Sequence, residues 1–165
     1  MKNKMKKSEI KKTNAIRILE KEKIVHEVHT YEVDENDVSA ENVAKKTGQD
    51  ITKVFKTLVS KSDKNEFLVA CIPGAEELSL KALAKVAGCK KVEMIHLKEV
   101  LPITGYIRGG VSPVGMKKHF RTFIHESALE EETIFVSGGL RGIQIEVNPE
   151  DLRVLVTGEF GNLVK

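Results

Sequence analysis

Lys56 interrupts an otherwise apolar run, VFKTLV, at residues 54–59. If the run is a β-strand, Lys56 lies on the same face as Val54 and Leu58, because side chains alternate along a strand. A cation among apolar neighbours is costly unless an anion pairs with it. A helix would instead turn Lys56 toward solvent. The β-branched residues of the run favour the strand, so we predict that Lys56 is half-buried and can bind an anion.

Two glycine-dense segments could complete an anion-binding pocket. Residues 109–115 read GGVSPVG, residues 137–142 read SGGLRG, and each segment follows an expected strand. Glycine allows the backbone to approach a ligand closely, so its amide N–H groups can hold a phosphate, a carboxylate or a developing oxyanion. Tight turns between strands are the alternative explanation for each segment alone. Together with the embedded lysine, the two segments favour a shared pocket.

The common catalytic templates are absent from the sequence. There is no G-x-S-x-G, P-loop, G-x-G-x-x-G or C-x-x-C motif. His26 and His29 are the nearest metal candidate, but no third ligand accompanies them in the sequence, so we interpret both as structural or surface histidines. Cys71 and Cys89 lie in apolar surroundings and are expected to be core thiols rather than a disulfide. We therefore predict neither a metal nor a cofactor.

Composition indicates a soluble globular protein with room for a buried pocket. The 165 residues are 41% hydrophobic and 31% charged. Residues 1–12 carry +5, which leaves −2 of the net +3 for the rest, so we expect a basic disordered tail before one domain at residues 13–165. The longest apolar stretches are far too short for a membrane span, and no secretory signal is indicated. A cytoplasmic location is expected.

Capping residues and apolar periodicity indicate where the elements lie. Helices are expected at residues 13–23, 39–48 and 79–88 and from Asn148-Pro149 onward, with capping positions at Thr13 or Asn14, Ser39, Ser79 and Asn148. Strands are expected at residues 28–33, 54–59, 67–72, 92–95, 106–108, 122–124, 134–137 and 143–147. Because regular βαβ alternation is missing, the pattern predicts an α/β (α+β) fold in which a mixed, partly wrapped sheet has helices packed outside it.

An ordered set of short motifs resembles the YbaK/EbsC family of free-standing aminoacyl-tRNA deacylases. The motifs are HTY at 29–31, FKTL at 55–58, TGY at 104–106, GGVSP at 109–113 with Gly115 and Lys117-Lys118, and VSGG at 136–139 with Arg141-Gly142. A single F-K-T-L would be weak support, whereas the ordered set covers about residues 13–160. The family fold is a mixed, partly barrel-like β-sheet with surrounding helices, which agrees with the fold class expected from the elements.

The resemblance implies trans-editing, which is the removal of a wrongly attached amino acid after a synthetase has released the tRNA. Prolyl-tRNA synthetase has difficulty rejecting cysteine, because a pocket cannot exclude a side chain that fits inside it. In the family, the lysine matching Lys56 is the essential site residue and the tyrosine matching Tyr31 lines the pocket. Segments matching Gly109, Gly110 and Ser112, and Ser137 and Gly138, complete the substrate site.

The resemblance also implies a mechanism and partners. For cysteine-specific members, the substrate's own thiol is thought to attack its ester carbonyl, so that the enzyme positions and polarises the ester. Expected partners are the 3′ acceptor end of an aminoacyl-tRNA and prolyl-tRNA synthetase, with a monomer as the default state. Leu140 departs from the family pattern, because many relatives carry a lysine there.

Two alternatives to a Cys-tRNA(Pro) deacylase stay open. One is a sister specificity, such as Ala-tRNA(Pro) deacylation by water, and the other is a binding module without turnover.

Overall fold

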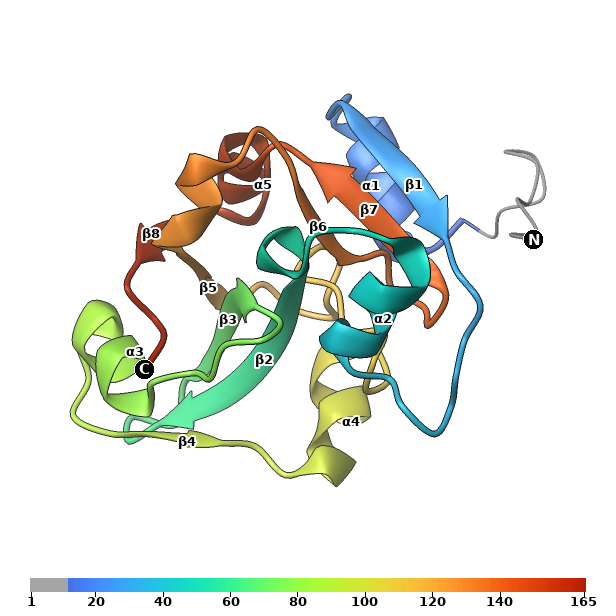
Figure 1. The fold of residues 1–165 in the computed structure, drawn as a ribbon. Helices are drawn as coiled ribbons and strands as arrows, with labels where there is room; N and C mark the ends of the chain where they lie inside the picture. The colour runs from blue at the N-terminus through green and yellow to red at the C-terminus, as the bar shows by residue number, and fades with distance from the viewer. Residues whose placement is uncertain (1–11) are drawn as a thin grey trace.

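The computed structural model describes residues 12–165 as two β-sheets with helices around them (Figure 1). The five-stranded sheet has the order β4 (Val92–Met94), β2 (Phe55–Ser62), β3 (Phe67–Pro73), β5 (Arg121–His125) and β8 (Glu159–Gly161). The three-stranded sheet has the order β1 (His26–Thr30), β7 (Ile143–Val147) and β6 (Ile134–Ser137). The β3–β5 and β5–β8 pairs are parallel and the other strand pairs are antiparallel, so the larger sheet is mixed.

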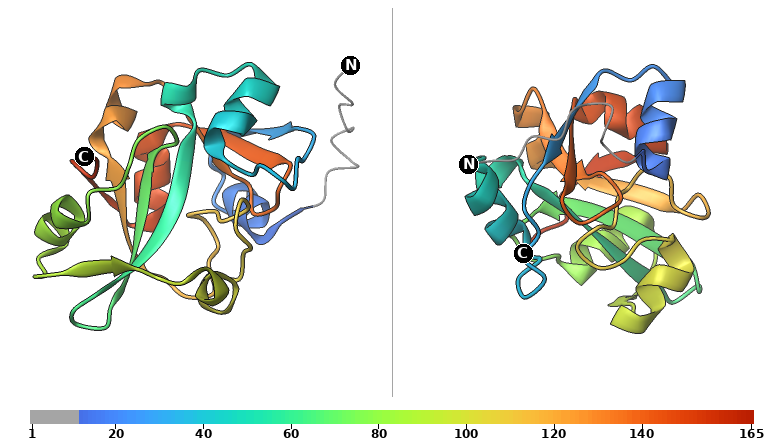
Figure 2. Two further views of the ribbon diagram at one scale, coloured as in Figure 1. Left: turned by 60° about the horizontal axis from the view of Figure 1, so that its bottom comes forward. Right: turned by 90° about the vertical axis from the view of Figure 1, so that its right-hand side faces the viewer.

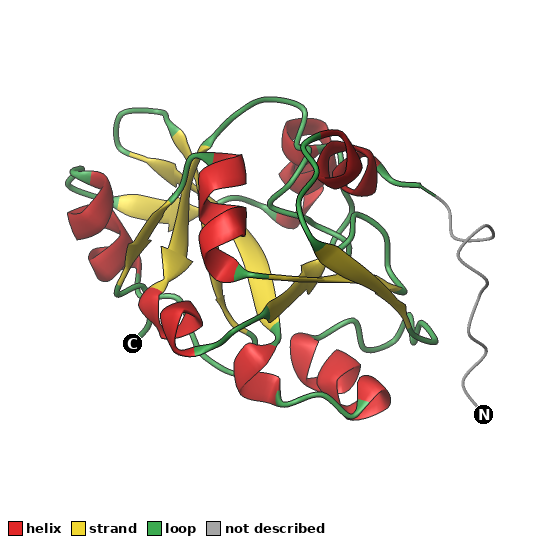
Figure 3. Ribbon diagram, turned by 90° about the horizontal axis from the view of Figure 1, so that it is seen from above, coloured by secondary structure: helices red, strands yellow, loops and turns green. Residues whose placement is uncertain are grey.

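Helices lie around the outside of the sheets (Figure 2, Figure 3). The α-helices are α1 (Asn14–Lys21), α2 (Ala40–Thr47), α3 (Leu80–Ala87), α4 (Val100–Thr104) and α5 (Pro149–Val156). Short 3₁₀ turns are η1 (Ile51–Lys53), η2 (Leu97–Glu99) and η3 (Glu126–Glu130). The expected mixed α/β class with surrounding helices is confirmed, although the two sheets do not close into a barrel.

Four helices begin at the capping residues that the sequence predicts. The side chains of Thr13, Ser39, Ser79 and Asn148 each accept a hydrogen bond from a backbone N–H of the first helical turn. Gly48 and Gly88 end α2 and α3 with φ angles of 71° and 76°, in the left-handed region that favours glycine. Capping side chains therefore determine where these four helices begin, and glycine determines where α2 and α3 end.

Two apolar cores lie on opposite faces of the five-stranded sheet. The first contains residues of α1, α5, β6 and β7 and includes Phe55 from β2. The second packs α3 against β3 and β5, and Leu58 contacts its edge. Neighbouring residues of β2 thus face different cores, as the strand interpretation of residues 54–59 requires. That interpretation is confirmed, because residues 55–62 form β2 and pair with β3.

The first half of β2 is where the two sheets meet. Val54 and Phe135 form an isolated parallel bridge that connects the start of β2 to β6. Within the described residues, β4 pairs with β2 over Ser60–Ser62, and the chain then leads away through η2 to α4 (Figure 1). The edge of β2 beside Lys56 is therefore left uncovered by β4.

Some sequence expectations are wrong or incomplete. The strand expected at residues 106–108 is a turn, because Gly105 ends α4 with φ 85° and Gly110 N–H donates to the Ile107 carbonyl at 2.9 Å. The buried Tyr106 hydroxyl donates to the Val114 carbonyl at 2.6 Å, which fixes this turn. Helix α4 and strand β8 were not expected.

Of the tail expected at residues 1–12, residues 1–11 lie outside the described part of the chain. None of the helices in residues 12–165 has the length and apolar character needed to cross a bilayer.

We predict that Thr13→Ala lowers the free energy of unfolding by about 1–2 kcal/mol, because two hydrogen bonds are lost. The Thr13 hydroxyl accepts from the Ile16 N–H and donates to the Gly138 carbonyl, which links α1 to the loop after β6. Urea denaturation of both variants measures the effect, and Thr13→Ser should keep most of the stability. Equal stability of Thr13→Ala and the unsubstituted protein would contradict this role.

Candidate active site

A cavity of about 470 Å³ opens beside the uncovered edge of β2. Its walls come from the start of β2, the start of α2, the segment from β4 to α4, the loops after β1 and α4, the end of β6, and β7. The lining is mostly apolar. Its polar and charged members are Tyr31, Ser39, Glu41, Lys56, Thr57, Arg108, Ser137 and Gln144. Such a mixture of apolar walls and a few polar groups is typical of small-ligand sites.

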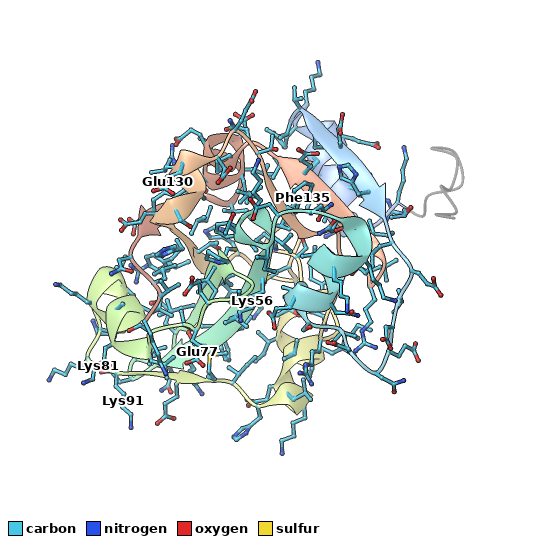
Figure 4. All side chains as sticks on the ribbon, in the orientation of Figure 1. Lys56, Glu77, Lys81, Lys91, Glu130 and Phe135 are labelled. Atoms are coloured by element: carbon cyan, nitrogen blue, oxygen red, sulfur yellow. The ribbon has the colours of Figure 1, made fainter. Side chains whose placement is uncertain are left out.

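Lys56 is the half-buried cation of this cavity. Its Nζ donates a hydrogen bond to the Gly74 carbonyl at 2.9 Å. Among residues 12–165, no carboxylate lies within ion-pair distance of this ammonium group. The charge is therefore held in place without being neutralised, and partial burial reduces its screening by water. In Figure 4, Lys56 lies in the middle of the view, whereas Lys81 and Lys91 extend from the rim.

Three further residues expected at the site line the same cavity: Tyr31, Gly109 and Ser137. Burial raises the pKa of the Tyr31 hydroxyl, so it stays protonated and can donate at neutral pH. Gly109 has φ 84°, and a Cβ built on it would lie 2.8 Å from the Val38 Cβ. Glycine is thus needed at this position both for its backbone conformation and for space.

The other three expected residues are not part of the lining. Gly110 N–H donates to the Ile107 carbonyl and Gly138 N–H donates to the Ile143 carbonyl, both at 2.9 Å. The fully buried Ser112 accepts from the Val114 N–H. These contacts form the turns that support Gly109 and Ser137. Arg141 joins the two loops, because its Nε donates to the Arg108 carbonyl at 2.8 Å.

The sequence interpretation missed Gln144, which lines the cavity although only 4% of the residue is exposed. Its Oε1 accepts a hydrogen bond from Gln49 Nε2 at 2.9 Å. The alternation in IQIEV at residues 143–147 was a usable signal, because it puts Gln144 on the polar face of β7. Arg108 was also missed as part of the lining, since its position depends on the turn that replaces the expected strand.

His26 and His29 do not act as a pair. His26 Nδ1 lies 2.7 Å from the Ile24 carbonyl, whereas His29 Nε2 lies 2.9 Å from Glu146 Oε1. The ligand atoms of Glu27, His29 and Glu146 lie within 4.8 Å of one another, which is close enough for a metal ion. The bond between His29 and Glu146 already satisfies both groups, however, and Glu146 also accepts from Thr133. These contacts agree with a structural role for His29.

Cys71 is buried beneath the cavity wall, where its Sγ lies 3.8 Å from Thr57 Oγ1. Burial raises the pKa of the Cys71 thiol to about 12. The lining residues include hydroxyl groups but neither cysteine nor histidine. A protein nucleophile activated by histidine or a low-pKa thiol is therefore not supported at this site.

A lysine that is held by a carbonyl, without an ion-pair partner in the described residues, in a largely apolar cavity is suited to binding an anionic ligand. The family model described as "Aminoacyl-tRNA editing domain" matches residues 34–155. The chain belongs to this family. The match covers the cavity-lining residues from Val38 to Gln144, including Lys56.

Individual relatives agree with this membership. The chain is 47% identical to "Putative Cys-tRNA(Pro)/Cys-tRNA(Cys) deacylase EbsC" of Enterococcus faecalis, over 96% of each protein. It is 29% identical to the proline–tRNA ligase of Brachyspira hyodysenteriae, over 84% of this chain and 24% of the ligase. The "Crystal structure of a putative trans-editing enzyme for prolyl tRNA synthetase" shares the fold, with a TM-score of 0.74, 21% identity, and coverage of 85% of this chain and 87% of that one.

We predict that iodoacetamide at pH 8 leaves Cys71 unlabelled in the folded protein. With its pKa raised to about 12, the thiol stays protonated at that pH, and burial blocks the reagent. Mass spectrometry of labelled peptides checks this, and protein unfolded in urea is the control, in which Cys71 should react. Rapid labelling of Cys71 in the folded protein would show that the thiol is accessible.

Proposed function

We propose that this protein is a trans-editing deacylase that removes cysteine from mischarged Cys-tRNA(Pro), and that Cys-tRNA(Cys) is a further substrate. The observation that carries the proposal is the Lys56 ammonium, held by a backbone carbonyl in a largely apolar cavity beside Tyr31, Gly109 and Ser137. The 47% identity to EbsC supports the same substrate class.

Lys56 has the charge and position to bind the aminoacylated 3′ end of the tRNA. The ester carbonyl gains negative charge when it is attacked, and the neighbouring phosphate is already anionic. A cation fixed before the reaction stabilises the charge that develops, and does so more strongly where little water screens it. The protonated Tyr31 hydroxyl supplies a second donor at the same cavity.

The proposed chemical step uses the thiol of the substrate itself. The cysteine sulfur attacks the ester carbonyl carbon, the bond from that carbon to the ribose oxygen breaks, and the oxygen leaves as the tRNA hydroxyl after taking up the thiol proton. The amino acid leaves as a thiolactone. Alignment of the reacting atoms can supply about 7–11 kcal/mol of the barrier and one oxyanion donor about 3–4 kcal/mol. Positioning could thus provide most of the catalysis without a protein nucleophile.

Selectivity for cysteine would then be chemical, because alanine in the same pose has no group that can attack. Two other outcomes are distinguishable on a panel of mischarged tRNAs. Faster cleavage of Ala-tRNA(Pro) would indicate a water-based sister activity. Binding of aminoacyl-tRNA without any cleavage would indicate a module that captures its ligand. We further propose association with prolyl-tRNA synthetase, since the aligned ligase carries a similar segment.

We predict that Lys56→Ala lowers the single-turnover rate on Cys-tRNA(Pro) at least about 100-fold, because an oxyanion-type donor is lost. Lys61→Ala is the matched control on the same strand, since Lys61 is exposed and lies over the Phe67 ring. It should keep a rate near that of the unsubstituted protein. Full activity of a folded Lys56→Ala variant would contradict the proposed catalytic role of Lys56.

We also predict that S-methylated cysteine on tRNA(Pro) is cleaved no faster than the uncatalysed background. The methyl group removes the attacking thiol while leaving the ester intact. Acid-gel separation of charged and uncharged tRNA measures both rates, and a competition assay shows whether the methylated substrate still binds. Equal cleavage of free and methylated cysteine would show that water attacks instead.

A further inference from the structure

Both backbone polar groups of Gly74 form hydrogen bonds with the segment that carries Lys56. It follows β3 directly, and its N–H donates to the Val54 carbonyl at 2.7 Å, which extends the β2–β3 ladder by one residue. Its carbonyl accepts from Lys56 Nζ at 2.9 Å. The end of the ladder therefore provides the hydrogen-bond acceptor for the cavity cation.

Gly74 also has no room for a side chain. A Cβ built on it would lie 2.2 Å from the Ala40 Cβ. Two non-bonded carbon atoms do not approach this closely, so the backbone at one of the two residues would have to move. Ala40 is the first residue of α2, and Ser39, Ala40 and Glu41 all line the cavity. The missing side chain lets the start of α2 pack directly against the end of the ladder, so that one wall of the cavity lies next to Lys56.

Position 74 requires glycine because there is no space for a side chain, and not because of its backbone conformation. Seven glycines in the described residues have a positive φ angle, and Gly74 is not among them. Another residue could adopt its backbone conformation, but its side chain would meet Ala40 or the Val54 carbonyl, which lies 3.2 Å from the built Cβ. A turn requirement therefore does not account for this position.

We propose that Gly74 is a positioning residue of the active site, which holds the Lys56 ammonium with its carbonyl and, by lacking a side chain, sets the distance of α2 from it. The inference rests on the proposed function for its kinetic readout. Gly74→Ala forces either the ladder end or the start of α2 to move. Lys56 then loses its alignment with the bound ester.

The test is a set of four variants assayed for single-turnover deacylation of Cys-tRNA(Pro): Gly74→Ala, Ala40→Gly, the double variant with both changes, and Gly74→Ala combined with Lys56→Ala. Gly74→Ala should be slower at least about tenfold, because a misplacement of about 1 Å can cost more than that. The double variant should return to within about threefold of the rate of Ala40→Gly alone, since removing the Ala40 methyl relieves the contact.

Two controls separate positioning from general damage to the fold. Gly161 lies on β8, away from the cavity lining. Gly161→Ala adds a methyl group 3.2 Å from the side chain of Val86 and should keep its activity. Adding Gly74→Ala to Lys56→Ala should cause no further loss of rate, because the lysine that Gly74 positions is already gone. Thermal melts show whether each variant is folded.

A second readout does not need the enzymatic assay. Trace labelling with acetic anhydride, followed by mass spectrometry, gives the acetylation rate of Lys56 relative to the exposed Lys81 of the same molecule. The ratio should change at least about threefold in Gly74→Ala and return in the double variant, as expected when alignment is lost and regained. If the unsubstituted protein cleaves no aminoacyl-tRNA, the proposed function fails, and this ratio still decides the role of Gly74.

Three results would overturn the inference. The first is a Gly74→Ala variant with the activity and labelling ratio of the unsubstituted protein. The second is a folded double variant that stays as slow as Gly74→Ala. The third is a further loss of rate when Gly74→Ala is added to Lys56→Ala, which would mean that Gly74 acts independently of the lysine.

Discussion

The site depends on one constraint: a positive charge must stay in a partly apolar cavity although no carboxylate of residues 12–165 lies within ion-pair distance of it. The hydrogen bond from Lys56 to the Gly74 carbonyl meets this constraint, because a carbonyl orients an ammonium group but does not cancel its charge. A salt bridge would hold the side chain more strongly, yet it would also compete with an anionic ligand. The arrangement therefore leaves the ammonium charge free to pair with an anionic ligand, and the other lining residues surround that position.

The fold supplies the space in which this charge can act. β4 pairs with the second half of β2, and the first half meets the smaller sheet through the bridge between Val54 and Phe135. The uncovered edge between these two contacts is where the cavity opens. The start of α2, the loop after α4 and the end of β6 form further walls. Lys56, the proposed catalytic residue, thus lies on a strand that is paired with β3, while helix and loop segments form the other walls.

Local signals in the sequence predicted much of the fold but less of the site. Helix caps such as Ser39 and Asn148 and the alternation around Lys56 depend on neighbouring residues, so they could be recognised directly. The turn at residues 106–108 could not be recognised, because it depends on the hydrogen bond from the Tyr106 hydroxyl to the Val114 carbonyl, which joins residues that are not neighbours in the sequence. The role of Gly74 was equally hidden, since the space it leaves is filled by Ala40, 34 positions away in the sequence.

The stretch of the proline–tRNA ligase that is similar to this chain makes up 24% of that ligase. The central claim is that the aminoacylated 3′ end binds at Lys56. A crystal structure with an amide-linked cysteinyl-adenosine analogue, which cannot be cleaved as an ester, tests it most directly. We expect a hydrogen bond from Lys56 Nζ to the amide carbonyl oxygen of the ligand, with Tyr31 and Ser137 beside the aminoacyl group. A ligand bound outside this cavity, or one that leaves Lys56 without contact, would contradict it.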